Sequence, residues 1–410
     1  MKYIRWIAIS GLTVFLLLRG IVPAMEGVGT DFPNYYTSAR LLVSGADTRR
    51  IYDDDWFQEQ IQLNGINQPG KFSPFPPVTA FVLVPFAFAS PLDALRMWTV
   101  LNFGLLAYAC YVVAQITNRS WYWGALLFLL TGHALANNFR FGQFYLVLTL
   151  LVLSGYRKWI QGEATSSGVL LAIGTAVKYF PALFLVEFIV RRERKIIVSF
   201  VTTLCVLMIL GIAVMGPAVH VQFLRSVLGP HLQGNIQDPF SPTFQSWNSL
   251  FRRLFLYDSI RNPNPFIQAS FAYVVCLTLI YGAVVAALMA GMRQASHRFG
   301  EYGPSIQFAL IGVAGLLLLP ASATYHFLLL VPSVAILLGG KVWNLPQKIL
   351  AVLYSCIGFI PFRFFDQFAS SGIFTVMAYP RLMLMTGLFT ASVAIAWKGP
   401  EHPTQLSVES

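Results

Sequence analysis

The amino-acid sequence predicts an all-α polytopic membrane protein that crosses the bilayer about twelve times. Of its 410 residues, 56% are hydrophobic and only 11% are charged, whereas a soluble domain carries about 25% charged residues. The apolar residues form long runs, and roughly 20 of them cross a ~30 Å hydrocarbon core as one helix. The short alternating strands of an outer-membrane barrel are absent from the pattern. Since backbone groups in lipid must pair within their own segment, helices are the predicted spans.

Twelve apolar segments are predicted to make these crossings within a single integral membrane domain, residues 1–410. The first resembles a signal peptide, but Arg19 lies late in its apolar run and many spans follow, so an uncleaved helix is predicted. The segments 75–90 and 142–157 are short, which favours tilted, broken or re-entrant helices. In chain order the predicted spans are 4–24, 75–90, 92–116, 121–138, 142–157, 166–190, 196–216, 267–292, 304–320, 322–340, 348–362 and 373–397.

Two hydrophilic stretches, 25–74 and 217–265, interrupt the apolar pattern and are predicted to be long external loops. The twelve-span order places both on one side of the membrane. The basic run 191–195 is the strongest cytoplasmic signal among the short connections, so the two loops are predicted to face outside the cytoplasm. The pair Arg157-Lys158 does not fit this orientation and leaves the topology of 119–158 open. Residues 400–410 are predicted to be a polar tail.

The basic balance of the chain indicates lipid rather than nucleic acid as a partner. The formal net charge of +11 is spread over loops without a Lys/Arg-rich tract, which favours anionic headgroups. The four cysteines lie singly in apolar stretches and are interpreted as packing residues. The triplet 53–55, three aspartates, is more typical of a solvated acidic turn than of a metal site. No metal and no cofactor are expected.

Two charged residues stand out as candidate functional groups. Asp31 lies a few residues beyond the first span, in DFPNYY (31–36), at the depth of lipid headgroups. From position alone, a carboxylate that caps the following helix is the favoured interpretation. Lys178 lies near the middle of the predicted span 166–190. A charge at that depth is costly and is a functional candidate by default, in preference to a side chain that snorkels to the surface.

Other polar residues interrupt apolar runs with weaker signals. Arg140 and Gln143 flank a glycine in NFRFGQFYL (138–146), a pattern that an ordinary interhelical turn also explains. His326 follows Ser322, Thr324 and Tyr325, and this small polar cluster makes a site and a hydrogen-bonded packing role equally consistent with the sequence.

The second hydrophilic stretch contains TFQSWNSLFRRL (243–254), which combines Asn248, Arg252 and Arg253 with aromatic residues. A basic aromatic loop of this kind can also anchor on headgroups at the membrane surface.

Taken in order, five segments resemble the polyprenol-phosphate-mannose-dependent glycosyltransferases of glycosyltransferase family 87, which have the GT-C membrane fold. The resemblance covers most of the chain and depends on order and spacing, because no single segment is specific. It weakens in the C-terminal third apart from His326. The segments are DFPNYY (31–36), KFSPFPPVTAFVLVPFA (71–87), FGQFYLVL (141–148), AVKYFPALFL (176–185) and QSWNSLFRRL (245–254).

The resemblance implies a lipid-linked donor and an acidic catalytic base on the first external loop, at the position of Asp31. Candidates to bind the donor phosphate are Lys178, Arg140 and His326, with Arg252 or Arg253 in reserve. Candidates to bind substrate are Tyr35, Tyr36, Gln143 and Asn248.

The reaction that follows from these assignments is transfer of a hexose, most simply mannose, from a polyprenyl phosphate to a hydroxyl of a lipid or cell-envelope glycan. Inversion by a single displacement needs one base, Asp31, and no metal. If Lys178 contacts the phosphate, Lys178→Met weakens donor binding more than it slows chemistry. The plasma membrane is the expected location. The alternatives are a transporter or flippase for an anionic lipid or sugar phosphate, lined by Lys178 and Arg140, and a non-catalytic scaffold.

Overall fold

A computed structural model describes residues 2–340 and 342–399 of the chain. In this part of the chain the backbone is helical apart from turns and one isolated bridge between Asp258 and Asn262. The prediction of an all-α protein is therefore confirmed for the described residues. The predicted polar tail, residues 400–410, lies outside them.

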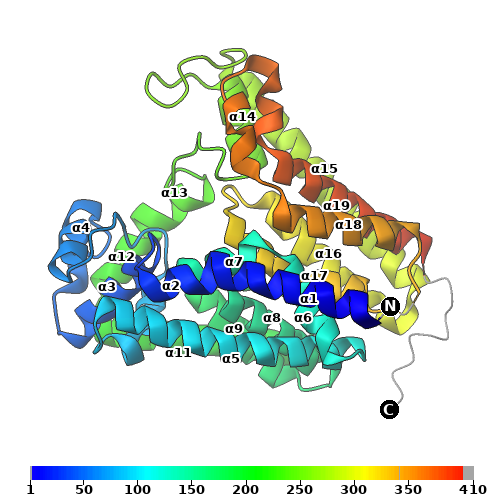
Figure 1. Ribbon diagram of the computed structural model, residues 1–410, viewed down its shortest axis with the longest axis horizontal. Coiled ribbons are helices and arrows are strands. Elements are labelled where there is room, and N and C mark those ends of the chain that lie inside the picture. Colours follow the sequence, from blue (N-terminus) through cyan, green and yellow to red (C-terminus); the bar gives the residue numbers. More distant parts are fainter. Residues whose placement is uncertain (1, 341, 400–410) are drawn as a thin grey trace. The chain divides into compact units, whose positions relative to one another are not determined.

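Backbone contacts divide the chain into two compact units. The first unit runs up to Ala114 and resumes over Ser120–Leu232, and the second holds Gln115–Arg119 and the chain from Gln233 onward. The first unit contains α1 (Lys2–Leu16), α2 (Val22–Glu26), α3 (Phe32–Val43), α4 (Asp54–Leu63), most of α5 (Pro91–Thr117), α6 (Trp121–Leu130), α7 (His133–Arg140), α8 (Tyr145–Ile160), α9 (Ala164–Val177), α10 (Leu185–Val190), α11 (Arg194–Met215), α12 (Pro217–Gln222) and α13 (Gly229–Leu232). The second contains α14 (Trp247–Phe255), α15 (Ser270–Arg298), α16 (Gly303–Leu318), α17 (Leu330–Leu337), α18 (Leu345–Phe359) and α19 (Pro380–Lys398) (Figure 1).

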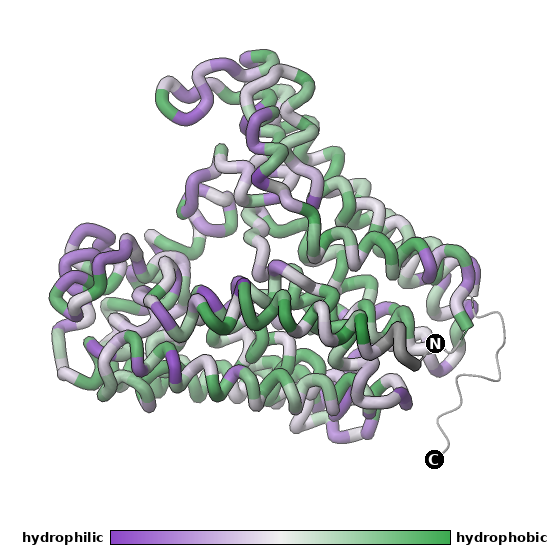
Figure 2. The backbone as a smooth tube through the Cα atoms, in the orientation of Figure 1, coloured by the Kyte–Doolittle hydropathy of each residue, from purple (hydrophilic) through white to green (hydrophobic). Residues whose placement is uncertain are grey.

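Six helices of the described chain are long and apolar enough to cross a membrane, and each overlaps a predicted span. They indicate a multi-pass membrane protein. In Figure 2 the long helices are mostly hydrophobic, whereas hydrophilic residues gather around α4. The six segments are Trp6–Glu26, Pro91–Thr117, Arg194–Met215, Ser270–Arg298, Gly300–Leu318 and Pro380–Lys398.

The other predicted spans are short or broken, so the count of twelve crossings stays a prediction. Span 75–90 consists of two 3₁₀ turns, Pro77–Phe81 and Val84–Phe86. Span 142–157 corresponds to α8, which meets α7 at a bend of 118°. Span 166–190 is not one helix, because α9 ends at Val177 and α10 begins only at Leu185.

The stretch predicted as the first loop contains two helices, and its acidic triplet begins the second of them. Asp53 caps α4 by accepting a hydrogen bond from the backbone N–H of Trp56 at 3.1 Å. The Arg50 guanidinium lies 2.7 Å from the same carboxylate, and this contact lowers the pKa of Asp53. Asp54 forms a longer ion pair with Lys71, at 3.6 Å. Capping and ion pairing therefore account for Asp53 and Asp54.

Close packing in the first unit brings the start of α3 near the end of α9. The turn Pro77–Phe81 contacts both helices, and the Thr79 hydroxyl donates to the carbonyl of Val177, the last residue of α9, at 2.8 Å. On its other side α9 packs against α8 and α11. The two ends that meet at this turn carry Asp31 and Lys178.

In the second unit, α15, α16 and α19 pack on one another, and α18 packs on α19. Arg381 lies at the start of α19 and is only 1% exposed. Its guanidinium donates to the Thr324 hydroxyl at 2.6 Å and to the Ile360 carbonyl at 3.2 Å. These bonds hold the turn Thr324–Leu329, which carries His326, against α19.

Candidate active site

Asp31 occupies the residue before α3, yet its carboxylate does not cap that helix. No hydrogen bond joins the side chain to the first turn of α3. Instead, the Gln143 carboxamide donates from Nε2 to Asp31 Oδ2 at 2.6 Å. The capping interpretation favoured from position alone is therefore wrong, and the carboxylate is held by a residue more than a hundred positions away in sequence.

The other end of the Gln143 amide is held by a buried cation and a tyrosine. Gln143 Oε1 accepts from the Tyr35 hydroxyl at 2.7 Å and from Lys178 Nζ at 3.2 Å. Lys178 also donates to the Tyr35 hydroxyl at 3.0 Å. The exposed fractions are 0% for Tyr35, 1% for Gln143 and 8% for Lys178. Because an ammonium can only donate, Oε1 must face Lys178 and the amide N–H must face Asp31.

A helix break places Lys178 in this network. Pro181 lacks an N–H, and its ring would clash with the carbonyl of Val177 if α9 continued. The helix instead ends, and Lys178 has an extended backbone (φ −153°, ψ 137°). The carbonyl that loses its helical partner accepts the hydrogen bond from Thr79. The charge that looked deep within a continuous span thus lies at a break between helical segments.

The bend between α7 and α8 places Gln143. Gly142 has φ +61°, and a Cβ atom there would lie 2.5 Å from Cδ2 of Phe32. The bend is closed by Asn138, whose side-chain Oδ1 accepts from the backbone N–H of Leu146 at 3.1 Å and whose backbone carbonyl accepts from that of Gln143 at 2.9 Å. The glycine lets the bend approach α3, and this approach brings Gln143 to Asp31.

Aromatic rings surround the buried ammonium. Lys178 Nζ lies 4.2 Å from the centroid of the Tyr145 ring and 4.8 Å from that of Phe75. The Tyr35 ring packs 4.1 Å from that of Phe144 and 4.8 Å from that of Phe75. Ring faces attract a desolvated cation, so they offset part of the cost of burial. Tyr145, Phe75 and Phe144 lie in the segments 71–87 and 141–148 that resemble family 87, but no sequence pattern predicted them as site residues.

Two further predicted residues of the first unit have other contacts. The Tyr36 hydroxyl donates to the Ala89 carbonyl at 2.8 Å, and its ring stacks 6.0 Å from that of Phe32. Arg140, the last residue of α7, is exposed, with its guanidinium 5.5 Å from the centroid of the Phe141 ring.

The remaining predicted residues belong to the second unit, where the two arginines donate hydrogen bonds to side-chain and backbone oxygens of neighbouring segments. Arg252 donates to Asn248 Oδ1 at 3.1 Å and to Asn235 Oδ1 at 2.8 Å. Arg253 donates to the Ala369 carbonyl at 2.8 Å. His326 lies in the turn Thr324–Leu329, with its ring 5.3 Å from that of Tyr325.

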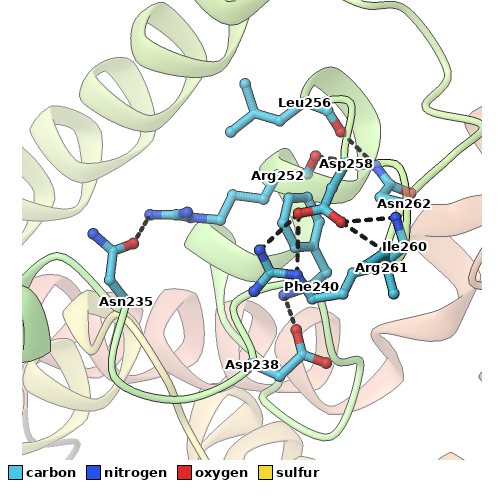
Figure 3. A network of polar contacts seen from close by, with 9 residues as sticks. All are labelled: Asn235, Asp238, Phe240, Arg252, Leu256, Asp258, Ile260, Arg261 and Asn262. Carbon is cyan, nitrogen blue, oxygen red and sulfur yellow. Dashed lines mark hydrogen bonds and ion pairs between the residues drawn. The ribbon is translucent and has the colours of Figure 1, made fainter.

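The turn after α14 is closed by its own polar contacts (Figure 3). Arg261 lies 2.6 Å from Asp258, and this hydrogen-bonded contact lowers the pKa of Asp258 to about 2. Asn262 donates to the Leu256 carbonyl at 2.6 Å. Among the described residues, no group of three or more His, Cys, Asp or Glu side chains could hold a metal ion.

Comparison with known proteins decides which family this chain belongs to. The model of glycosyltransferase family 87 matches residues 74–303, more than half of the chain. The chain belongs to glycosyltransferase family 87. The resemblance seen in the ordered sequence segments is therefore confirmed.

The match to family 87 includes Gln143 and Lys178, begins after Asp31 and ends before His326. A relative from Mycobacterium tuberculosis (strain ATCC 25618 / H37Rv) is 26% identical over 306 residues, which are 70% of this chain and 66% of the relative. That relative is named as a polyprenol-phosphate-mannose-dependent alpha-(1-2)-phosphatidylinositol mannoside mannosyltransferase. The match with this chain thus covers just under two thirds of the relative's length.

Gly142→Ala is expected to destabilise this family 87 protein by about 1–3 kcal/mol. A left-handed backbone is costly for a residue with a Cβ atom, and the new methyl group would contact Phe32. Thermal unfolding in detergent measures the change. Gly104→Ala, in α5 with no atom within 4 Å of a Cβ at that position, is the control and should leave the midpoint unchanged or slightly raised. Equal midpoints for the two variants would contradict the packing of Gly142 on Phe32.

His231 was not predicted from the sequence, yet it lies near Tyr179 and within the electrostatic influence of Lys178. Its ring is 5.4 Å from that of Tyr179. Burial and the charge of Lys178 lower the pKa of the His231 imidazole to about 4, from an ordinary value of 6.5. The folded protein therefore holds this ring neutral at neutral pH.

His231→Gln is expected to reduce the acid sensitivity of the fold. Because the folded pKa is below the unfolded value, the unfolded chain takes up the proton first. The stability that neutral His231 contributes is complete above pH 6.5 and is lost as the pH falls toward 4. Unfolding midpoints at pH 7.5 and 5.0 should therefore differ less in the variant than in the wild type. His297→Gln, at an exposed histidine, is the control. If both variants changed the difference between the two midpoints equally, the lowered pKa of His231 would not be the cause.

Proposed function

We propose that the chain is a membrane glycosyltransferase that moves a hexose, specifically mannose, from a polyprenyl phosphate to a hydroxyl of a lipid or cell-envelope glycan. Membership of glycosyltransferase family 87 supports the reaction class. The name of the mycobacterial relative supports both the donor and a lipid-anchored acceptor such as a phosphatidylinositol mannoside. The site is proposed to face outside the cytoplasm at the plasma membrane, as the basic run 191–195 predicts.

In the proposed reaction, Asp31 is the general base. The acceptor hydroxyl oxygen attacks the anomeric carbon, the bond from that carbon to the phosphate oxygen breaks, and the polyprenyl phosphate leaves with the electron pair. The hydroxyl proton passes to the Asp31 carboxylate. The observation that carries this proposal is the 2.6 Å hydrogen bond from Gln143 to Asp31 Oδ2. A hydrogen bond donated to a carboxylate favours its charged form, which is the form that accepts a proton.

Gln143 and Lys178 are proposed to position this base. Lys178 and Tyr35 fix the orientation of the Gln143 amide, and the amide in turn fixes one oxygen of Asp31. These contacts support a role for Lys178 that acts through Gln143, as an alternative to direct contact with the donor phosphate. The phosphate assignment made from the sequence stays a prediction, and the two roles change different kinetic constants.

The other assignments also remain proposals. Neutralising the leaving phosphate needs cationic or hydrogen-bonding groups already in place, and the candidates are Arg140, His326, Arg252 and Arg253. Tyr36 and Asn248 are the remaining candidates for contact with substrate.

The donor class and the stereochemistry test the proposed reaction directly. The full chain in lipid nanodiscs is given either polyprenyl-phosphate mannose or a nucleotide-linked mannose, together with a lipid extract that contains phosphatidylinositol mannosides. Transfer from the polyprenyl phosphate alone, with an anomeric configuration opposite to that of the donor, is expected. Transfer from the nucleotide sugar would overturn the donor class, and retained configuration would overturn the single displacement.

A further inference from the structure

A groove of about 490 Å³ lies on the first unit between α9 and α11 and has no part in the proposed reaction. Its lining consists of two cations, Arg194 and Lys195, two apolar side chains, Val169 and Val198, and four hydroxyl side chains, which include Thr165 and Thr202. A surface groove with cations and apolar walls matches a ligand that has both a charged and an apolar part.

The groove has a fixed floor because its two helices touch. A Cβ atom on Gly168 of α9 would lie 2.4 Å from the Ile196 carbonyl oxygen of α11 and 2.1 Å from Ser199 Oγ. Only glycine permits this approach. The shape of the groove therefore belongs to the packed helices and does not depend on the rotamers of surface side chains alone.

The two cations lack a carboxylate partner within the described chain. Arg194 and Lys195 are exposed, and none of the ion pairs formed by residues 2–340 and 342–399 includes either of them. They begin the 22-residue helix α11, where the helix dipole disfavours positive charge. A bound anion would remove this unfavourable electrostatic interaction.

The same helix is long and apolar enough to span a membrane, which favours a ligand that lipid presents. The segment Arg194–Met215 is apolar enough to cross a membrane, and Val198, one turn from the cations, is 63% exposed. Arg194 and Lys195 therefore lie at the headgroup level of the bilayer, and Val198 lies at the level where acyl chains begin.

We propose that this groove binds one anionic glycerophospholipid. Its phosphate contacts Arg194 and Lys195, its glycerol region lies between Thr165 and Thr202, and an acyl chain follows Val169 and Val198. The lipid would hold α9 against α11 from the membrane side.

Native mass spectrometry of the full chain, delipidated in detergent and titrated with single lipids, tests this proposal. Phosphatidylglycerol is expected to bind roughly tenfold more tightly than phosphatidylcholine with the same acyl chains, because each cation near an anionic headgroup contributes. Arg194→Ala combined with Lys195→Ala should reduce this preference to near unity. Val198→Trp keeps both cations but fills the apolar part, and should weaken phosphatidylglycerol binding at least fivefold.

The matched control is Arg293→Ala combined with Arg298→Ala, which removes two exposed cations at the end of another span, α15. It should keep the tenfold preference. An equal loss of preference in this control, or no preference in the wild type, would overturn the proposal. Inorganic phosphate at millimolar concentration should not displace the lipid, and displacement would show a free-anion site instead.

Discussion

Asp31→Asn is expected to lower kcat by about 10²–10⁴, the contribution typical of a general base. The asparagine amide keeps the size of the side chain but cannot accept the hydroxyl proton. Since Gln143 already donates to this position at 2.6 Å, the variant side chain can turn its own carbonyl oxygen toward Gln143 and keep the local packing. Donor affinity should therefore change little. Initial rates of mannose transfer and equilibrium binding of the polyprenyl-phosphate donor measure the two effects separately.

Asp55→Asn is the control for that experiment, because Asp55 is an exposed acid of α4 in the same polar stretch. It should transfer mannose at the wild-type rate. If Asp31→Asn kept more than a tenth of the wild-type kcat, Asp31 would not be the base, although the reaction class could stand.

Lys178→Met is expected to lower kcat by about 10²-fold with a smaller change in the donor KM. Methionine fills similar volume, so the aromatic packing by Tyr145 and Phe75 can persist. The Gln143 amide, however, loses the charged donor that fixes its orientation. Misplacing a catalytic group by about 1 Å can cost this much. Removing one member of a buried charged network destabilises many folds, so the unfolding midpoint of the variant is measured beside the rates to separate the loss of activity from unfolding.

The kinetic pattern decides between the two roles of Lys178. A rise in the donor KM that exceeds the fall in kcat would show that the ammonium binds the phosphate, as the sequence alone predicted. Gln143→Leu should reproduce the Lys178→Met pattern if both residues act through Asp31. Lys348→Met, at an exposed lysine of α18, controls for the loss of one positive charge.

Much of the fold could be predicted from the sequence because lipid imposes a simple rule on long spans. Runs such as 92–116 and 196–216 have one stable solution, an uninterrupted helix, and the structure has α5 and α11 there. The breaks were harder to predict. The span 166–190 is mostly apolar but contains two charged residues, Lys178 and Glu187. Hydropathy does not register the missing N–H of Pro181. The end of the helix at Val177 is stabilised by a residue distant in sequence, because the Thr79 hydroxyl donates a hydrogen bond to the Val177 carbonyl.

The candidate site was partly predictable for a related reason. Gln143 and Lys178 were visible as polar residues in apolar surroundings, where an unpaired group is costly, and Asp31 was visible as an acid just beyond the first span. Their pairing depends on the Gly142 bend and on the contact of the turn Pro77–Phe81 with two helices, which no local pattern reveals. The aromatic partners of Lys178 could not be identified from the sequence, because aromatic residues are common throughout this chain.

Arg381 was missed although a signal was present. It lies inside the predicted span 373–397, and a charge within a span is a functional candidate by default. The structure buries it against Thr324 and Ile360 in the second unit.

The most direct test of Asp31 as the base of a sugar transfer is a single-turnover measurement with the purified full chain in nanodiscs. Polyprenyl-phosphate [¹⁴C]mannose is bound first, an extract of membrane lipids is added as acceptor, and labelled products are separated with wild type and Asp31→Asn side by side. We expect the label to move into a new lipid or glycan with the wild type and to remain on the donor with the variant. The contradicting result is a wild type that binds the donor, never converts it and moves it across the bilayer. That result would exclude the transferase and support a lipid-sugar transporter.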